Sequence, residues 1–179
     1  MEAASSVGLM AGFFSYLSLF FLRPIACRVH LLDTPDHRKL RKGSVPLIGG
    51  LSAFVGVSVA WMIGMPLISG HGLFLICAAL LVIVGAVDDA RDLPAKFRLG
   101  VQVLLGAVLT FGSGTSLVTF GNLLGFGPIE LGILGPLVTI AAVIGATNAF
   151  NMVDGIDGLA GSLSLVALGS LALLFSTSS

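Results

Sequence analysis

Residues 73–98 read LFLICAALLVIVGAVDDARDLPAKFR, and this stretch decides the class of fold. Its first part, Leu73–Val87, contains no charged side chain, whereas its second part, Asp88–Arg98, contains six. An uncharged apolar run that passes directly into a charged segment is typical of a membrane helix at the point where it leaves the lipid.

The composition of the whole chain agrees with this interpretation. Apolar residues make up 56% of the 179 residues, charged residues only 10%, and the mean hydropathy is +1.06. A water-facing surface needs roughly a quarter or more of its residues charged, so a soluble globule is excluded. The formal net charge is zero, so no basic field argues for a nucleic-acid partner. The sequence predicts an integral membrane protein that lies in a lipid bilayer.

Six apolar segments are long enough, with their flanks, to be membrane spans. The ends of the third, fourth and fifth are expected to run into the neighbouring polar residues. The predicted spans are Ser5–Leu22, Pro46–Leu67, Leu73–Val87, Leu99–Gly112, Leu134–Asn148 and Leu159–Phe175.

The charges predict how these spans are oriented. Sixteen of the 18 charged residues lie in Arg23–Lys42, in Asp88–Arg98, or at Asp154 and Asp157. Six alternating spans place these three segments on one side, and because they hold all nine Lys and Arg, the positive-inside rule makes that side cytoplasmic. Both termini are then outside, together with the loop Ser113–Ile133.

The loop between the fourth and fifth spans carries Gly and Pro around short β-like runs, which predicts a small extracytoplasmic hairpin. No repeat or linker divides the chain. The expected fold is therefore an all-α integral membrane domain over residues 1–179, with about six transmembrane helices.

Asp88 and Asp89 form the first candidate site. If the preceding helix continues into this pair, two anions lie at its C-terminus, where the helix dipole is also negative. A bound cation would relieve this conflict, and Mg²⁺ suits oxygen ligands with retained waters better than zinc does. The alternative is a charged loop at the membrane exit, partly neutralised by Arg91, Lys96 and Arg98. Spacing alone favours neither.

A second polar cluster reads NAFNMVDGIDG, over residues 148–158. Amide or carboxylate side chains recur every third residue in an otherwise apolar stretch, which exceeds what a helix exit needs. The adjacent glycines would allow a ligand to approach the backbone closely. A polar helix exit with turn residues remains the alternative. The four side chains are those of Asn148, Asn151, Asp154 and Asp157.

The third candidate is a basic loop, DTPDHRKLRKGSVPLIGG, over residues 33–50. Its cations can bind phosphates, or they can serve only to orient the chain in the membrane. They are Arg38, Lys39, Arg41 and Lys42. Separately, Gly8 and Gly12 form a G-x-x-x-G motif. We expect this motif to support packing within the protein, with homodimerisation as the alternative.

Together, three segments resemble the polyprenyl-phosphate N-acetylhexosamine-1-phosphate transferases. They are DTPDHRKLRKGSVPLIGG, GAVDDARDLPAKFRLGVQ and GATNAFNMVDGIDGLAG, and the likeness runs from Asp33 to Gly169. It is strongest to bacterial members that use N-acetylglucosamine and undecaprenyl phosphate. The third motif, in order after an Asp-Asp segment, is highly specific.

The resemblance implies an enzyme of the bacterial cytoplasmic membrane. It would transfer a UDP-linked N-acetylhexosamine 1-phosphate to a polyprenyl phosphate, release UMP and serve the synthesis of cell-envelope polysaccharide. It implies that Asp88 and Asp89 hold Mg²⁺, with Mn²⁺ as an alternative. The implied catalytic residues are Asp88, Asp89, Asp154 and Asp157, and the implied substrate-binding residues are Asn148, Asn151, Arg38, Lys39, Arg41 and Lys42.

Members of this family are about twice as long as this chain, which is therefore expected to be the N-terminal half of such an enzyme. The alternative is a membrane assembly subunit that keeps the fold and is inactive or depends on a partner. A transporter is disfavoured, because no Asp, Glu, Lys or Arg lies in the middle of a predicted span.

Overall fold

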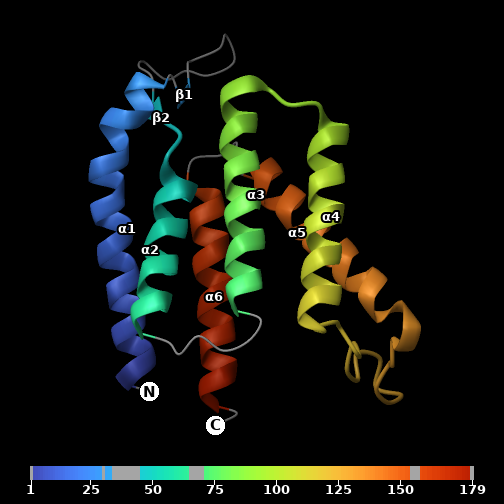
Figure 1. Cartoon of the computed structure of the whole chain (residues 1–179). Helices are drawn as coiled ribbons and strands as arrows, with labels where there is room; N and C mark the ends of the chain where they lie inside the picture. The colour runs from blue at the N-terminus through green and yellow to red at the C-terminus, as the bar shows by residue number, and fades with distance from the viewer. Residues whose placement is uncertain (1, 30, 34–44, 65–70, 154–157, 178–179) are drawn as a thin grey trace. The chain divides into compact units, whose positions relative to one another are not determined.

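The computed structural model describes residues 2–29, 31–33, 45–64, 71–153 and 158–177 (Figure 1). Within these ranges nearly all regular structure is helical, as predicted. The α-helices are α1 (Glu2–Arg28), α2 (Gly49–Gly64), α3 (His71–Arg91), α4 (Ala95–Ser113), α5 (Gly135–Val153) and α6 (Leu159–Thr177). A 3₁₀ turn, η1 (Gly132–Leu134), precedes α5, and two short strands, β1 (Leu32–Asp33) and β2 (Val45–Pro46), lie between α1 and α2.

Four helical segments of the described chain are long and apolar enough to cross a membrane: Ser6–Arg28, His71–Arg91, Ala95–Ser113 and Gly132–Val153. Two further apolar helices are shorter, at Gly49–Gly64 and Leu159–Leu174. A multi-pass membrane protein follows from these lengths and compositions, whereas the total of six spans and the outer position of both termini stay predictions.

The helix ends differ from the predicted spans in an informative way. As expected for a short predicted segment, α3 runs past Val87 to Arg91 and so includes Asp88 and Asp89. The predicted start of the second span at Pro46 is wrong, because Pro46 pairs with Leu32 in the β1–β2 ladder and α2 begins only at Gly49.

The chain divides into two compact units, Met1–Ser116 and Leu117–Ser179. Whether they form one membrane domain is still a prediction, and each unit is described separately. In both units most large apolar side chains are exposed, whereas few residues are fully buried. This is the reverse of a soluble protein, and it is expected where lipid rather than water surrounds the helices.

In the first unit, α1 and α2 pack closely through small residues. The Ser18 hydroxyl donates to the carbonyl oxygens of Ser15 and Ser52, at 3.1 Å each. Gly56 of α2 also lies against α1. A Cβ on Gly56 would lie 2.6 Å from the carbonyl oxygen of Ala11 and closer still to Ser15, so only glycine fits.

The G-x-x-x-G motif does not make this contact. No described atom lies within 4 Å of a Cβ built on Gly8 or Gly12. The expectation that these two glycines support packing within the protein is therefore wrong for the described residues, because serines and Gly56 bring α1 and α2 together instead. Homodimerisation stays a prediction.

In the second unit, an antiparallel bridge joins Thr119 to Glu130 ahead of η1 and α5. The predicted hairpin falls on this segment, and the side of the membrane on which it lies stays a prediction. Leu117 N–H donates to Thr139 Oγ1 at 2.8 Å, which ties the start of the segment to the first turns of α5.

Candidate functional site

Asp88 and Asp89 lie on the last turn of α3, which ends at Arg91. The Asp88 side chain is largely buried, with 11% of its surface exposed, whereas Asp89 is exposed. Successive helical residues project about 100° apart, so the two carboxylates face different surroundings.

Both carboxylate oxygens of Asp88 accept hydrogen bonds from the segment that follows. The Leu93 N–H donates to Oδ1 at 2.9 Å, and Arg98 Nη1 forms an ion pair with Oδ2. The backbone supports this arrangement, since Asp92 takes a left-handed conformation (φ 53°) and its N–H donates to the Asp88 carbonyl at 2.7 Å. Aspartate tolerates this conformation better than most residues.

Pro94 then starts the next helix. Its φ of −57° and ψ of 132° place it at the N-cap of α4, and its carbonyl accepts the N–H groups of Phe97 (2.9 Å) and Arg98 (3.3 Å). Proline suits this end of a helix, because its φ is already helical and it has no N–H to satisfy. The short turn carries Arg98 back to the carboxylate ten residues earlier in the chain.

Arg98 is a site residue that sequence reasoning did not select. It was considered only as one of three cations that could neutralise a charged loop, and the structure shows that it is the partner of Asp88. The sequence did carry a signal for this contact, which is the short stretch between two helical segments with Pro94 at the start of the second. A tight turn of this kind returns the first residues of the second helix to the end of the first, and so brings Arg98 to Asp88.

The second cluster falls in the other compact unit. Asn148 and Asn151 lie three residues apart near the end of α5, and Nδ2 of Asn148 donates to the Ile144 carbonyl at 2.9 Å. Asn151 is exposed. Asp154 and Asp157 lie outside the described residues, so their predicted roles stay predictions.

The four cations of the basic loop also lie outside the described residues, but the segments at both ends of the loop are described. β1 and β2 pair antiparallel with Asp33 opposite Val45, and Leu47 N–H donates to the Leu31 carbonyl at 3.1 Å. The loop therefore leaves and re-enters the described chain at neighbouring points. Its predicted phosphate ligands are Arg38, Lys39, Arg41 and Lys42.

The carboxylate oxygens of Asp88 and Asp89 are of the ligand type that magnesium prefers. No group of three His, Cys, Asp or Glu side chains that could hold a metal occurs among the described residues. Mg²⁺ commonly uses only one or two carboxylates and takes its remaining ligands from waters and substrate phosphates. Asp88 and Asp89 match that ligand type and number. They face different surroundings, and both Asp88 oxygens already accept hydrogen bonds from Leu93 and Arg98, so an ion held by both residues would use their remaining lone pairs.

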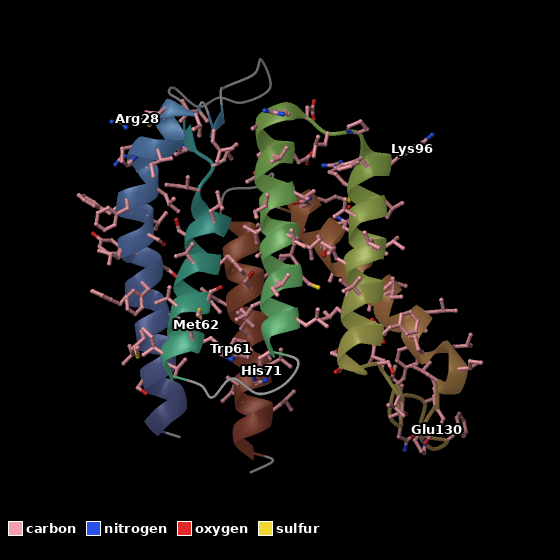
Figure 2. The ribbon with its side chains drawn as sticks, in the orientation of Figure 1. Arg28, Trp61, Met62, His71, Lys96 and Glu130 are labelled. Carbon is pink, nitrogen blue, oxygen red and sulfur yellow. The ribbon has the colours of Figure 1, made fainter. Side chains whose placement is uncertain are left out.

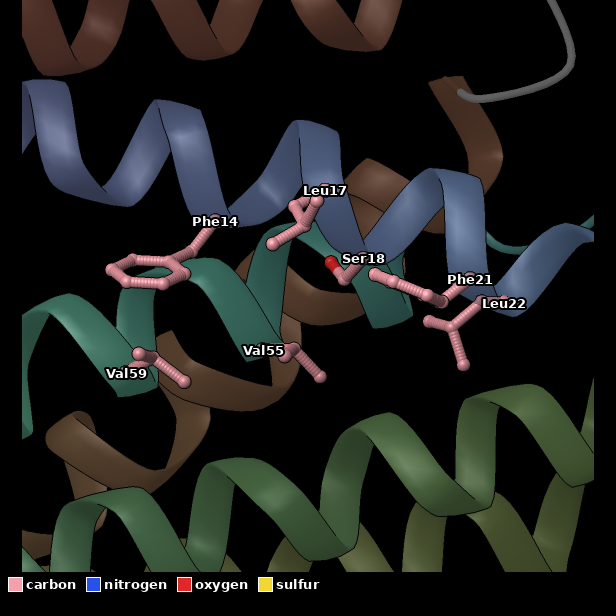
Figure 3. Close-up of a pocket in the computed structure, with 7 residues that line it drawn as sticks. All are labelled: Phe14, Leu17, Ser18, Phe21, Leu22, Val55 and Val59. Atoms are coloured by element: carbon pink, nitrogen blue, oxygen red, sulfur yellow. The ribbon is translucent and has the colours of Figure 1, made fainter.

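An apolar pocket of roughly 230 Å³ lies elsewhere in the first unit, between α1 and α2 (Figure 3). Its lining contains no charged group, and the Ser18 hydroxyl is already bonded to two backbone carbonyls, so it offers little to a phosphate. It is lined by Phe14, Leu17, Ser18, Phe21, Leu22, Val55 and Val59.

Comparison with known proteins agrees with the motifs. The model of glycosyl transferase family 4 matches residues 71–179, which include Asp88, Asp89 and the asparagines of α5. The chain is 44% identical over 164 residues to the undecaprenyl-phosphate alpha-N-acetylglucosaminyl 1-phosphate transferase of Yersinia pestis, an alignment that covers 90% of this chain and 44% of the relative.

Proteins with the same name in Escherichia coli K12 and Pasteurella multocida are 40% and 39% identical, over 90% and 70% of this chain and 44% and 35% of theirs. The chain thus spans less than half the length of these relatives. No solved structure matches it. Because the family model covers more than half of the chain, the resemblance seen in the motifs is confirmed, and the chain belongs to glycosyl transferase family 4.

Proposed function

We propose that this chain carries part or all of the site of an enzyme that transfers N-acetylglucosamine 1-phosphate from UDP-N-acetylglucosamine to undecaprenyl phosphate. The observation that supports it most is the position of Asp88 and Asp89 on the last turn of a helix that is long and apolar enough to cross a membrane. If α3 spans the membrane, carboxylates at that point would lie near the depth of a lipid phosphate, where a soluble nucleotide sugar could also reach.

In the proposed reaction, an oxygen of the lipid phosphate attacks the phosphorus bonded to the sugar and forms a new P–O bond. The bond between that phosphorus and the oxygen bridging to the uridine phosphate breaks, and UMP leaves with the electron pair. A phosphate monoester has its second pKa near 6, so the lipid phosphate is largely dianionic at neutral pH. The nucleophile therefore needs positioning more than it needs a base.

Positioning and charge neutralisation account for most of the catalysis of phosphoryl transfer. Asp88 and Asp89 would hold a magnesium ion, which when bound neutralises charge on the phosphate oxygens. Arg98 and the Leu93 N–H keep the Asp88 carboxylate oriented. The second polar cluster is proposed to contact the nucleotide sugar, through Asn148, Asn151, Asp154 and Asp157. The cations of the basic loop are proposed to contact the phosphates of the nucleotide sugar, and they are Arg38, Lys39, Arg41 and Lys42.

The charge distribution supports chemistry at the cytoplasmic face of the bacterial inner membrane. In the first unit, Arg28 and Lys96 lie at the same end of the helices, and Trp61, Met62 and His71 lie at the opposite end (Figure 2). Tryptophan is enriched at membrane interfaces, and cations are enriched on the cytoplasmic side. By that rule, the end bearing Arg28, Lys96 and the Asp88 turn is cytoplasmic.

The test is a transfer assay with the purified chain in nanodiscs that contain undecaprenyl phosphate. UDP-N-acetylglucosamine labelled in the sugar is added with and without Mg²⁺, and label in the lipid extract is measured. Asp88→Asn is the test variant, and we expect it to abolish Mg²⁺-dependent transfer of label to the lipid. Asp92→Asn removes an equal charge from the same turn and is the matched control, since asparagine also accepts the left-handed conformation.

Lipid label that needs Mg²⁺, persists in Asp92→Asn and is lost in Asp88→Asn would support the proposal. Label that appears only when the C-terminal part of a full-length relative is co-expressed would show a site divided between two segments. No label in either case would contradict the transferase and favour an inactive membrane assembly subunit.

A further inference from the structure

The loop between α4 and α5 is exposed and strongly apolar. Residues 117–131, here called the apolar loop, carry a single charge, at Glu130 (Figure 2). Its most exposed large side chains gather around its turn, with Phe126 97% exposed, Leu123 74% and Leu124 67%. These three side chains form what we call the tip.

Hydrogen bonds hold the base of the apolar loop in a defined shape. Phe120 N–H donates to the Ile129 carbonyl at 3.0 Å, and Ile129 N–H to the Gly121 carbonyl at 3.1 Å. The Thr119 hydroxyl donates to the Ile129 carbonyl at 2.9 Å and accepts the Gly121 N–H at 3.0 Å. The apolar loop thus has an ordered backbone, yet it does not use its tip to build a core.

The turn of the apolar loop is also specified locally. Gly125 (φ 81°) and Gly127 (φ 115°) take backbone conformations that other residues rarely adopt, and Gly127 N–H donates to Asn122 Oδ1 at 3.0 Å. Because the turn closes through glycines and one asparagine, its large apolar side chains are left to point outward. An ordered turn that displays apolar side chains marks an interaction surface.

The apolar loop is continuous with the exposed apolar surface of a membrane-length segment. Its first residue donates to Thr139 of α5 at 2.8 Å, and the membrane-length segment Gly132–Val153 starts immediately after it. Ile133 (92% exposed) and Leu137 (63%) extend the apolar surface into that segment. The base of the apolar loop is therefore held at one end of a segment that is long and apolar enough to cross a membrane.

We propose that the tip of the apolar loop inserts into the lipid of the leaflet where α5 begins, and that its partner is the lipid surface. The near absence of charge favours lipid over a protein partner, because protein interfaces usually have a polar rim. Aromatic and aliphatic side chains on an otherwise ordered element are also what interfacial binding elements present to the headgroup boundary.

The experiment uses a fluorescent reporter in the tip. The chain has one tryptophan, Trp61, so Trp61→Phe provides a silent background. Phe126→Trp then reports on the tip, and Thr115→Trp, at an exposed position outside the apolar loop, is the matched control. Each variant is placed at one chain per nanodisc and, in parallel, at two chains per nanodisc. The lipid has or lacks brominated acyl chains, and each sample is also titrated with aqueous iodide.

We expect brominated lipid to quench roughly half of the Phe126→Trp emission, because interfacial elements are buried about 5–10 Å into the headgroup boundary. Iodide should quench this variant much less than it quenches Thr115→Trp. If Phe126→Trp fails to fold, as judged by gel filtration and circular dichroism, Leu124→Trp is read in its place.

Two results would overturn the proposal. Iodide quenching that is equal for the tip and the control would show that the tip lies in water. Protection of the tip only in nanodiscs that hold two chains, with no quenching by brominated lipid, would show that a second copy covers it.

Discussion

Arg98 of α4 forms an ion pair with Asp88 of α3, across a turn that also brings the Leu93 N–H to the same carboxylate. A carboxylate at the C-terminal end of a helix is disfavoured by the helix dipole. Here the protein's own guanidinium offsets that repulsion. Asp88 therefore has a fixed orientation before any ion or substrate binds.

The first prediction concerns Asp88 itself. Asp88→Asn should reduce turnover by roughly 100-fold or more, the range seen when one preorganised group that stabilises a transition state is removed, and should change nucleotide affinity far less. Asparagine can still accept the Leu93 N–H, so the turn should persist. Transfer rates are compared with equilibrium binding of UDP-N-acetylglucosamine. Lost nucleotide binding with turnover otherwise intact would sink this prediction.

The second prediction concerns Arg98 as a positioning residue. Arg98→Gln should lower kcat about 10- to 100-fold, with a smaller change in KM for the nucleotide sugar, because small misplacements of a reacting group can cost that much. Arg98→Lys keeps the charge but not the planar fork, so its rate should lie between those of wild type and Arg98→Gln. Equal kcat in all three proteins would show that the ion pair is only structural.

The third prediction concerns removal of divalent ions. EDTA should abolish transfer, and Mg²⁺ should restore it. The melting temperature should change by less than about 2 °C, which corresponds to at most about 1 kcal/mol for a chain of this size, because Arg98 rather than a metal holds Asp88 in the fold. A large loss of thermal stability in EDTA, or full transfer activity in its presence, would contradict this prediction.

The fourth prediction concerns the contact between α1 and α2. Gly56→Ala should destabilise the chain by about 1–3 kcal/mol, as overpacking does, because its Cβ would meet Ala11 and Ser15. Thermal unfolding in detergent is the measurement.

The matched control for Gly56 is Gly85→Ala. Gly85 is in the interior of α3, and a Cβ there meets no described atom within 4 Å. Both substitutions share the gain in helix propensity from glycine to alanine, so their difference reports the close contact. Equal stability of the two variants would show that α1 and α2 tolerate a wider separation.

Much of the fold could be predicted from hydropathy because apolar runs must be buried in lipid or protein whatever their neighbours are. The run before Asp88 predicted a helix, and α3 follows it. Pro46 was misplaced because its pairing with Leu32 depends on a partner fourteen residues away, which no local pattern reveals. Gly8 and Gly12 misled in a similar way, because a motif for close approach does not say which helix approaches.

The residues of the candidate site could be predicted from the sequence, whereas the contacts between them could not. The conflict between Asp88 and the helix dipole is visible in the sequence, but three cations follow it, and choosing Arg98 among them requires the geometry of the turn that ends at Pro94. Asn148 is predicted to bind substrate, which stays a prediction, and only the structure shows that its side chain also donates to the Ile144 carbonyl of its own helix.

The sequence by itself determined the membrane class, the positions of the apolar helices and the family, because composition, hydropathy and motif order are properties of the chain alone. Only the tertiary structure decided that Arg98 is the partner of Asp88, that Gly56 lies against a neighbouring helix, and that the tip of the apolar loop is exposed among the described residues. Each of these depends on which segments approach each other in space, and that is set by the geometry of turns and by packing between helices.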